Sequence, residues 1–256
     1  MVERGDSTRR SQGAMTGGFY GPTGIAIPAV GEEQMREVDR IAIEETGPNL
    51  FQMMENAGRS LAITALEMMV KSHRGPVVVL AGTGGNGGGG ITAARHLANH
   101  GLEVVVAVSD EAGLGEVAAF QLRVFEATGG RHIYSSDLEG LSPALVIDAL
   151  IGYSLRNAPR GIVAEMIGWA GKQESPILAL DLPSGIDATT GHAPGTYIAA
   201  DTTMTLALPK RGLVNEAAGS LVLADLGIPV QTYRRAGVLL QESPFGDRFR
   251  IPLQRS

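Results

Sequence analysis

The stretch LAGTGGNGGGGITAARHL, from Leu80 to Leu97, decides the fold. Seven glycines between Gly82 and Gly90 separate an apolar run at 76–82 from a helical pattern at 91–101. The segment Gly82–Gly87 has the G-x-G-x-x-G spacing between a strand and a helix, the context in which that spacing binds dinucleotide phosphates. Glycine permits a sharp turn and a close approach of backbone N–H groups to a ligand. The loop either holds phosphate at the helix N-terminus or is a tight turn without a ligand.

Composition limits the classes of protein to consider. The chain has 256 residues, 44% of them hydrophobic and 19% charged, which fits one large domain or two small ones. It has no cysteine, so disulfides, thiolate zinc sites and thiol nucleophiles are excluded. A net charge of −6 argues against a nucleic-acid-binding surface. No apolar run reaches the roughly 18 residues of a membrane span, and we expect a cytoplasmic protein.

Strand and helix patterns alternate along the rest of the chain. This alternation indicates βαβ units and a mostly parallel sheet covered on both faces. Two helical patterns precede it, so we expect one domain at 30–240 with an N-terminal helical extension, a flexible tail at 1–29 and a C-terminal tail at 241–256. The expected helices of the extension lie at 31–45 and 49–72, and the clearest strands at 76–82, 103–109, 144–152, 176–185, 201–209 and 219–227, with a weak one at 131–136.

Two of these strands carry an aspartate near the carboxyl end, Asp148 and Asp181. A carboxylate in an apolar run is costly to bury unless it is paired, hydrogen-bonded or bound to a cation. Each aspartate either caps a loop by accepting backbone N–H bonds or belongs to a site. Ligands of open parallel sheets bind beyond the carboxyl ends of strands, so both aspartates together with the glycine loop favour a site. Oxygen ligands from Asn, Asp and Ser suit a hard cation.

Other polar residues leave alternatives open. Asp110 follows the second expected strand and is either a ribose ligand or a structural residue. The cationic segment Arg156–Gly161 either clamps phosphate or is a solvated loop. Asp187 reads as a turn residue. The five histidines show no metal-ligand spacing, although His96 and His100 lie one helical turn apart.

Six segments in unbroken order between residues 30 and 233 resemble one family. They are MMENAGRS (53–60), GTGGNGGGGITAARHL (82–97), IDALIGYSLRNAPRG (147–161), DLPSGIDATTG (181–191), MTLALPKRGL (204–213) and VLADLGIP (222–229). Together these segments resemble the NAD(P)H-hydrate epimerases, the YjeF amino-terminal domain family, in a stand-alone form without the dehydratase domain.

The resemblance implies a fold and an activity. The fold is a Rossmann-like three-layer αβα sandwich, often a homodimer. The activity is interconversion of the R and S forms of hydrated NADH or NADPH, so that a separate ADP- or ATP-dependent dehydratase can repair the S form. The implied cofactor is a potassium ion. Neither nucleic acid nor membrane is an expected partner.

The resemblance also implies roles for individual residues. The potassium ligands are Asn86, Asp148 and Ser184, and the catalytic residues are Asp181 and Asp148. The substrate-binding residues are Gly85, Asn86, Gly87, Gly88, Gly89, Gly152, Tyr153, Ser154, Leu155, Arg156, Asn157, Ala158 and Asp181. We hypothesise that Asp181 handles the proton, that Asp148 and its cation organise the loop, and that Arg156 and the helix after Gly87 hold phosphate. A carboxylate at an apolar strand end is expected to have a raised pKa, as an acid–base group needs.

Two positions depart from the family pattern, because Gly85 replaces an asparagine and Gly89 replaces an aspartate. Both changes remove polar groups but leave the backbone donors. The alternative function is therefore a catalytically weakened nucleotide-binding or regulatory protein on the same fold. A redox or other enzyme on this scaffold is a third possibility.

Overall fold

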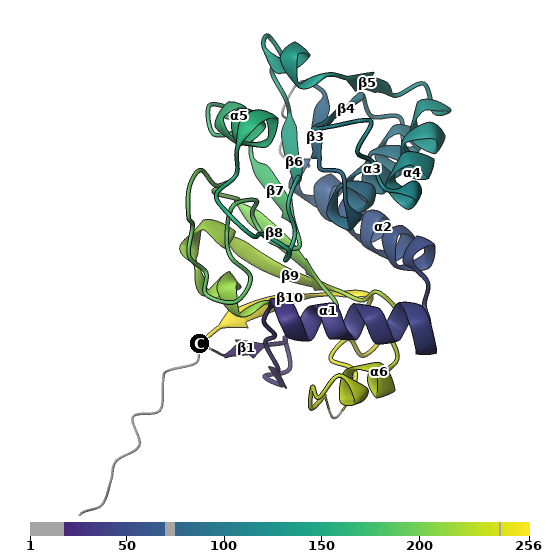
Figure 1. Cartoon of the computed structure of the whole chain (residues 1–256), viewed down its shortest axis with the longest axis vertical. Helices are drawn as coiled ribbons and strands as arrows, with labels where there is room; N and C mark the ends of the chain where they lie inside the picture. Colours follow the sequence, from purple (N-terminus) through teal and green to yellow (C-terminus); the bar gives the residue numbers. More distant parts are fainter. Residues whose placement is uncertain (1–17, 70–74, 241) are drawn as a thin grey trace, which may run out of the picture.

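The chain folds around a sheet in which the strands follow the order β2-β1-β10-β9-β8-β7-β6-β3-β4-β5 (Figure 1). This computed structural model describes residues 18–69, 75–240 and 242–256. The strands are β1 (Phe19–Tyr20), β2 (Ala26–Ile27), β3 (Val77–Ala81), β4 (Val104–Val108), β5 (Arg131–Ile133), β6 (Leu145–Ala149), β7 (Ile177–Leu180), β8 (Thr202–Leu206), β9 (Ser220–Ala224) and β10 (Arg250–Arg255).

The strand order reverses between β3 and β6. The strands from β9 to β5 pair in parallel, with Val77 of β3 opposite both Val104 and Leu145, whereas β10, β1 and β2 pair antiparallel. From β3 the chain moves outward to β4 and β5, and then returns to β6 on the other side of β3. In open parallel sheets a crevice for ligands forms at the carboxyl ends of strands at such a reversal.

Helices cover the sheet on both faces. α2, α3 and α4 lie on one face and α5 on the other, while α1 packs against the β9–β10 end (Figure 1). The helices are α1 (Glu32–Ile41), α2 (Leu50–Met69), α3 (Gly85–Asn99), α4 (Glu116–Glu126), α5 (Gly161–Ala170) and α6 (Val230–Arg235), with a π-helical turn η1 (Ala42–Thr46) and 3-10 turns η2 (Ser135–Leu138), η3 (Arg211–Val214) and η4 (Glu216–Ala218).

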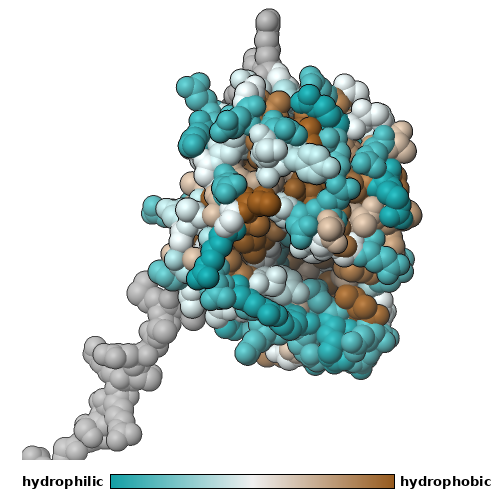
Figure 2. Space-filling view, turned by 45° about the horizontal axis from the view of Figure 1, so that its top comes forward, coloured by the Kyte–Doolittle hydropathy of each residue, from teal (hydrophilic) through white to brown (hydrophobic). Residues whose placement is uncertain are grey.

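The unbroken apolar strands follow from this coverage. Val77 and Val79 of β3 enter the core beneath α2, α3 and α4, whereas Val78 and Leu80 enter the core beneath α5. All four are fully buried, because a strand with helices on both faces has no solvated side. The space-filling view shows a face covered mainly by hydrophilic residues, with hydrophobic ones gathered in a central hollow (Figure 2). The predicted three-layer α/β fold is thus confirmed.

The predicted limits of the domain were wrong at both ends. The expected C-terminal tail at 241–256 contains β10, which pairs with β9 on one side and β1 on the other. The expected N-terminal tail at 1–29 contains β1 and β2, and its residues 1–17 lie outside the described residues. Residues 250–255 alternate between interior and surface, with Ile251 and Leu253 buried, but the short run gives only a weak strand signal.

The N-terminal helical extension is confirmed, with one difference. The expected helix at 31–45 is α-helical only to Ile41 and continues as the π-helical turn up to Gly47, where φ is 73°. No helix in the described ranges is long and apolar enough to cross a membrane.

Candidate functional site

The glycine loop and the loop after β6 meet at the point where the strand order reverses. A Cβ on Gly82 would lie 1.9 Å from the carbonyl oxygen of Leu150, and one on Gly87 would lie 1.8 Å from the carbonyl oxygen of Gly82. The Gly82 N–H also donates to the carbonyl of Ala149, at 3.0 Å. These two glycines are therefore required by the close approach of backbone to backbone.

The remaining loop glycines differ in their surroundings. Gly88 and Gly89 are buried in the first turns of α3, where a Cβ on Gly88 would meet the sulfur of Met54 at 2.6 Å. Gly85 is exposed, with Met54 Cε 3.9 Å from an added Cβ. The start of α3 thus packs closely on α2, and the exposed N–H groups before Gly87 keep the position that an anion requires.

Asp148 locks the end of β6 to the segment after β7. It is fully buried, its Oδ2 accepts the Ser184 N–H at 2.7 Å, and its Oδ1 accepts the Ser184 hydroxyl at 2.5 Å and the Leu150 N–H at 3.2 Å. Burial raises the pKa of Asp148 to about 6, against the opposing effect of the hydrogen bonds from Ser184 and Leu150. Asp148 thus accepts backbone N–H bonds, as one of the two alternatives for this residue predicts. It also contacts Ser184, a predicted cation ligand.

Asn86, the third predicted cation ligand, lies beside the loop after β6, which Asp148 and Ser184 hold. Its side chain is next to Gly152, where an added Cβ would be 3.2 Å from Asn86 Oδ1. Its buried amide nitrogen makes no hydrogen bond within the described part of the chain. A half-turn of the amide would place its oxygen there, and a cation would satisfy it. Asn, Asp and Ser side chains offer oxygen atoms, so the residue types of the three positions are compatible with the predicted cation.

Asp181 follows β7 in a strained turn. Its φ is 69°, and the Leu182 N–H donates to the Leu180 carbonyl at 2.9 Å, which closes a three-residue turn around Asp181. A left-handed backbone at a residue other than glycine costs about 1–3 kcal/mol, and such strain concentrates at functional sites.

The two oxygens of Asp181 have different surroundings. Oδ1 accepts the Leu206 N–H at 3.2 Å, a weak bond from the Thr205 hydroxyl at 3.4 Å, and the ammonium of Lys210. Among the described residues, none donates to Oδ2, and the side chain keeps about 5% exposure. One oxygen is thus anchored while the other remains available to a ligand.

Sequence reasoning missed two residues of this site, Lys210 and Asp39. Lys210, 1% exposed, pairs with Asp181 after β8, and the Tyr153 hydroxyl donates to Asp39 Oδ2 of α1 at 2.6 Å. Burial raises the pKa of Asp39, against the Tyr153 hydrogen bond and the charge of Lys210, while the charge of Asp181 adds to the rise. Burial, and then the charge of Asp39, raises the pKa of Tyr153 as well. Lys210 was detectable as one of two adjacent charged residues, with Arg211, in the mostly apolar segment MTLALPKRGL, whereas nothing in the pattern of α1 distinguishes Asp39 from a surface residue.

The substrate loop, residues 152–158, is only partly built into this cluster. Gly152 contacts Asn86, Tyr153 contacts Asp39, and Leu155 is buried. The other predicted residues stay outside the cluster: Ser154, Arg156 and Asn157 are exposed, and Ala158 lies near Gly195. Arg156 has no hydrogen-bond or ion-pair partner among the described residues, so the phosphate clamp and the solvated loop both stay open.

The remaining polar candidates are accounted for locally. Asp187 accepts the N–H groups of Thr189 and Thr190, as expected of a turn residue. Asp110 accepts the Gly113 N–H at 3.2 Å, which favours its structural reading. His96 contacts Glu55 of α2 at 2.8 Å, and no metal-binding cluster of His, Asp or Glu occurs in the described ranges.

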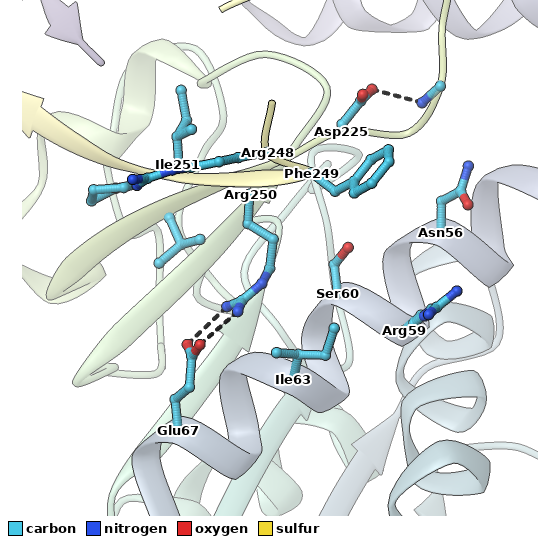
Figure 3. A pocket seen from close by; sticks show the side chains of 13 residues that line it. Asn56, Arg59, Ser60, Ile63, Glu67, Asp225, Arg248, Phe249, Arg250 and Ile251 are labelled. Atoms are coloured by element: carbon cyan, nitrogen blue, oxygen red, sulfur yellow. Dashed lines mark hydrogen bonds and ion pairs between the residues drawn. The ribbon is translucent and has the colours of Figure 1, made fainter. Parts of the chain in front are cut away.

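A cavity of about 780 Å³ lies away from this site, between α2 and β10 (Figure 3). Arg250 on its wall is paired with Glu67, and Asp225 accepts the Gly227 N–H at 2.7 Å. Neither Asp148 nor Asp181 lines it. Asp148 and Asp181 therefore belong to the ends of β6 and β7, apart from this cavity.

A parallel sheet with a glycine loop and two buried aspartates near the reversal of strand order defines a Rossmann-like α/β protein, a class in which ligands bind beyond the carboxyl ends of the strands. Residues 50–212 match the family model described as YjeF-related protein N-terminus. The chain belongs to this family, that of the NAD(P)H-hydrate epimerases.

Relatives support the same assignment. The chain is 52% identical over 228 residues to an NAD(P)H-hydrate epimerase of Dehalogenimonas lykanthroporepellens, covering 89% of this chain and 93% of the relative. It is 40% identical to a bifunctional NAD(P)H-hydrate repair enzyme of Hyperthermus butylicus, covering 73% of this chain but 36% of that longer protein. The crystal structure of the yeast protein YNL200c has the same fold, with a TM-score of 0.73 at 22% identity over 88% of this chain and all of that one.

The two departures from the family pattern should respond differently to reversal. Gly85→Asn is expected to leave thermal stability nearly unchanged, because the position is exposed and open. Gly89→Asp should lower stability by about 2 kcal/mol or more, since the position is buried and its Cβ would lie 2.9 Å from Leu180 Cδ2. Denaturant melts of the two variants measure the difference, and equal stabilities would contradict it.

Proposed function

We propose that this protein is an NAD(P)H-hydrate epimerase, an isomerase that interconverts the R and S forms of hydrated NADH and NADPH in nucleotide repair. The observation that carries the proposal is Asp181, held by one oxygen in a strained turn with the other oxygen unbonded within the described residues. The high identity to a stand-alone enzyme of that name, over nearly all of both chains, supports it.

The chemistry requires a group that moves one proton. The hydrated carbon carries a hydroxyl beside the ring nitrogen, so inversion occurs either by departure of the hydroxyl or by opening of the ring, followed by re-addition from the other face. Departure of the hydroxyl as water needs a proton donated to its oxygen. In the ring-opening route, Oδ2 of Asp181 would take the hydroxyl proton as the C–N bond breaks and the ring nitrogen gains a proton from solvent, and ring closure would reverse both transfers. Backbone N–H groups at the start of α3 would hold phosphate.

A coupled assay tests the function. Purified protein, potassium and an R/S mixture of hydrated NADH are combined with an S-specific dehydratase and its nucleotide. The R form should be consumed faster than by spontaneous epimerisation. If folded protein consumes the R form only at the spontaneous rate, the epimerase function is rejected. The alternative is then a nucleotide-binding or regulatory protein, which the loss of two polar loop residues at Gly85 and Gly89 favours.

We propose potassium as the resident cation, held by Asn86, Asp148 and Ser184. When bound, it would supply positive charge beside the buried Asp148 carboxylate and hold together the glycine loop, which carries Asn86, and the segment after β7, which carries Ser184. The buried, unbonded amide nitrogen of Asn86 supports the proposal only if the amide is turned, since its oxygen would then face the cation.

Potassium should therefore stabilise the protein selectively. At ten times its dissociation constant, a cation that binds only the folded chain adds about 1.4 kcal/mol. We expect a saturable rise in melting temperature with KCl that is absent with LiCl at equal ionic strength. Asn86→Ala should remove the rise, whereas Asn157→Ala, an exposed loop asparagine, should keep it. Equal effects of both salts on the unchanged protein would exclude the site.

Three further properties stay predictions: the homodimer, the cytoplasmic location and the functional partnership with a separate dehydratase. The bifunctional repair enzymes among the relatives support that partnership. Light scattering of the purified protein measures the first.

A further inference from the structure

Lys210 connects two strained turns at the ends of neighbouring strands. Asp181 directly follows β7 and has a φ of 69°, and Ala207 directly follows β8 and has a φ of 63°. Each is the centre of a three-residue turn, because Leu182 N–H donates to Leu180 O and Leu208 N–H donates to Leu206 O. Two adjacent turns of this rare kind need restraint from their surroundings.

The ammonium of Lys210 bonds to both turns. It pairs with Oδ1 of Asp181, and it donates to the carbonyl of Leu206 at 2.8 Å. The Leu206 N–H donates to the same Oδ1 at 3.2 Å, which closes a small polar ring of three residues. All of the directional restraint on the carboxylate thus falls on one oxygen.

The backbone holds Lys210 in place independently of its side chain. Val30 pairs with Lys210 in an isolated parallel bridge, with the Val30 N–H donating to Pro209 and the Arg211 N–H donating to Val30, each at 2.9 Å. The backbone therefore fixes the position of Lys210, whose side chain is 1% exposed. A buried charge is costly unless it is paired, and Asp181 pairs with this one.

The charge of the same ammonium also acts on a second carboxylate, that of half-buried Asp39. Asp39, held by the Tyr153 hydroxyl at 2.6 Å, feels the charges of both Lys210 and Asp181. Without the lysine, the charges of half-buried Asp39 and buried Asp181 would repel each other uncompensated, and Asp181 would move away from Asp39 or take up a proton.

We propose that Lys210 is a positioning residue for the epimerisation: it fixes the direction of the Asp181 carboxylate, offsets the charge of Asp39 and leaves Oδ2 of Asp181 available to the substrate. The inference rests on the proposed function and adds a residue to it. Lys210 acts through Asp181 and is assigned no contact with substrate.

The first test compares Lys210→Met with Thr203→Val in the coupled assay. Thr203 is a matched control, because it is a buried residue of β8 whose hydroxyl donates to the Ala218 carbonyl at 2.7 Å, away from the ion pair. Lys210→Met should lower kcat by about 100-fold or more with KM within about threefold, as expected when an interaction needed in the transition state is lost. Thr203→Val should leave both constants near the unchanged protein. A Lys210→Met kcat within about threefold of the original overturns the inference.

Chemical rescue separates charge from packing. In Lys210→Ala, propylammonium replaces the missing methylenes and ammonium, and 1-propanol has the same shape without the charge. Saturable recovery of kcat with propylammonium only is expected. Recovery with neither compound, or equally with both, overturns the inference. If Lys210→Met does not fold, propylammonium and 1-propanol are compared on Lys210→Ala. Recovery of both folding and turnover with propylammonium only is then the expected result. An unchanged protein with no activity would instead reject the proposed function.

Discussion

Replacing Asp181 with asparagine is expected to remove catalysed epimerisation while leaving affinity for the hydrated nucleotide nearly unchanged. Asparagine preserves the shape of the side chain and an acceptor for the Leu206 N–H, so the turn at the end of β7 can persist. What is lost is the ability of Oδ2 to take up and return a proton. Loss of a positioned acid–base group lowers rates by about 10²- to 10⁴-fold.

Stability must be measured together with activity in this variant. The change leaves the ammonium of Lys210 buried without its counter-charge, and breaking a buried pair from one side costs about 3–5 kcal/mol. Asp201→Asn is a suitable control, because Asp201 Oδ2 accepts the Ile177 N–H at 2.8 Å next to the start of β7, far from the strained turn. Full activity of folded Asp181→Asn would exclude Asp181 as the proton carrier.

Replacing Gly87 with alanine should have the largest effect on folding of any single methyl group added to the loop. The new Cβ would lie 1.8 Å from Gly82 O, 2.6 Å from Gly82 C and 2.9 Å from Gly82 N. All three are backbone atoms, so no rotamer change relieves the overlap, and the turn between β3 and α3 must open. We expect a loss of about 3 kcal/mol or more, a large part of the 5–15 kcal/mol typical of a domain.

Gly85→Ala is the matched control, two residues earlier in the same helix. Its Cβ would have only Met54 Cε nearby, at 3.9 Å, and alanine favours the helix over glycine by roughly 0.5–1 kcal/mol. Urea denaturation of both variants should therefore give shifts in opposite directions. Similar midpoints for the two would show that the close approach of Gly87 to Gly82 does not hold in solution.

The parallel core, and the position of two aspartates near the carboxyl ends of neighbouring strands, were predictable from sequence because local signals agreed with the global fold. Valine-rich runs such as 77–81 have no polar alternation and must be covered on both faces, and the glycines mark where β3 turns into α3. Asp148 and Asp181 stood out because a carboxylate in an apolar run has few explanations.

What sequence could not supply were the pairings between distant segments. Asp39 lies in an ordinary amphipathic helix. Its partial burial results from packing of the loop that carries Tyr153, 114 positions away, against α1. Lys210 is 29 positions from Asp181, and its role depends on the two turns being neighbours. The strand β10 was missed for the same reason, since its partners are β9 and β1.

The place of β10 has a consequence for how the chain is made. Within the described residues, β1 and β2 reach the sheet only through residues 250–255, which lie between β1 and β9. On the ribosome, β1 and β2 emerge long before β10 and can pair only with each other until β10 is synthesised. Until then β9 presents an open edge, and the nascent protein is most vulnerable to pairing with another chain at that stage.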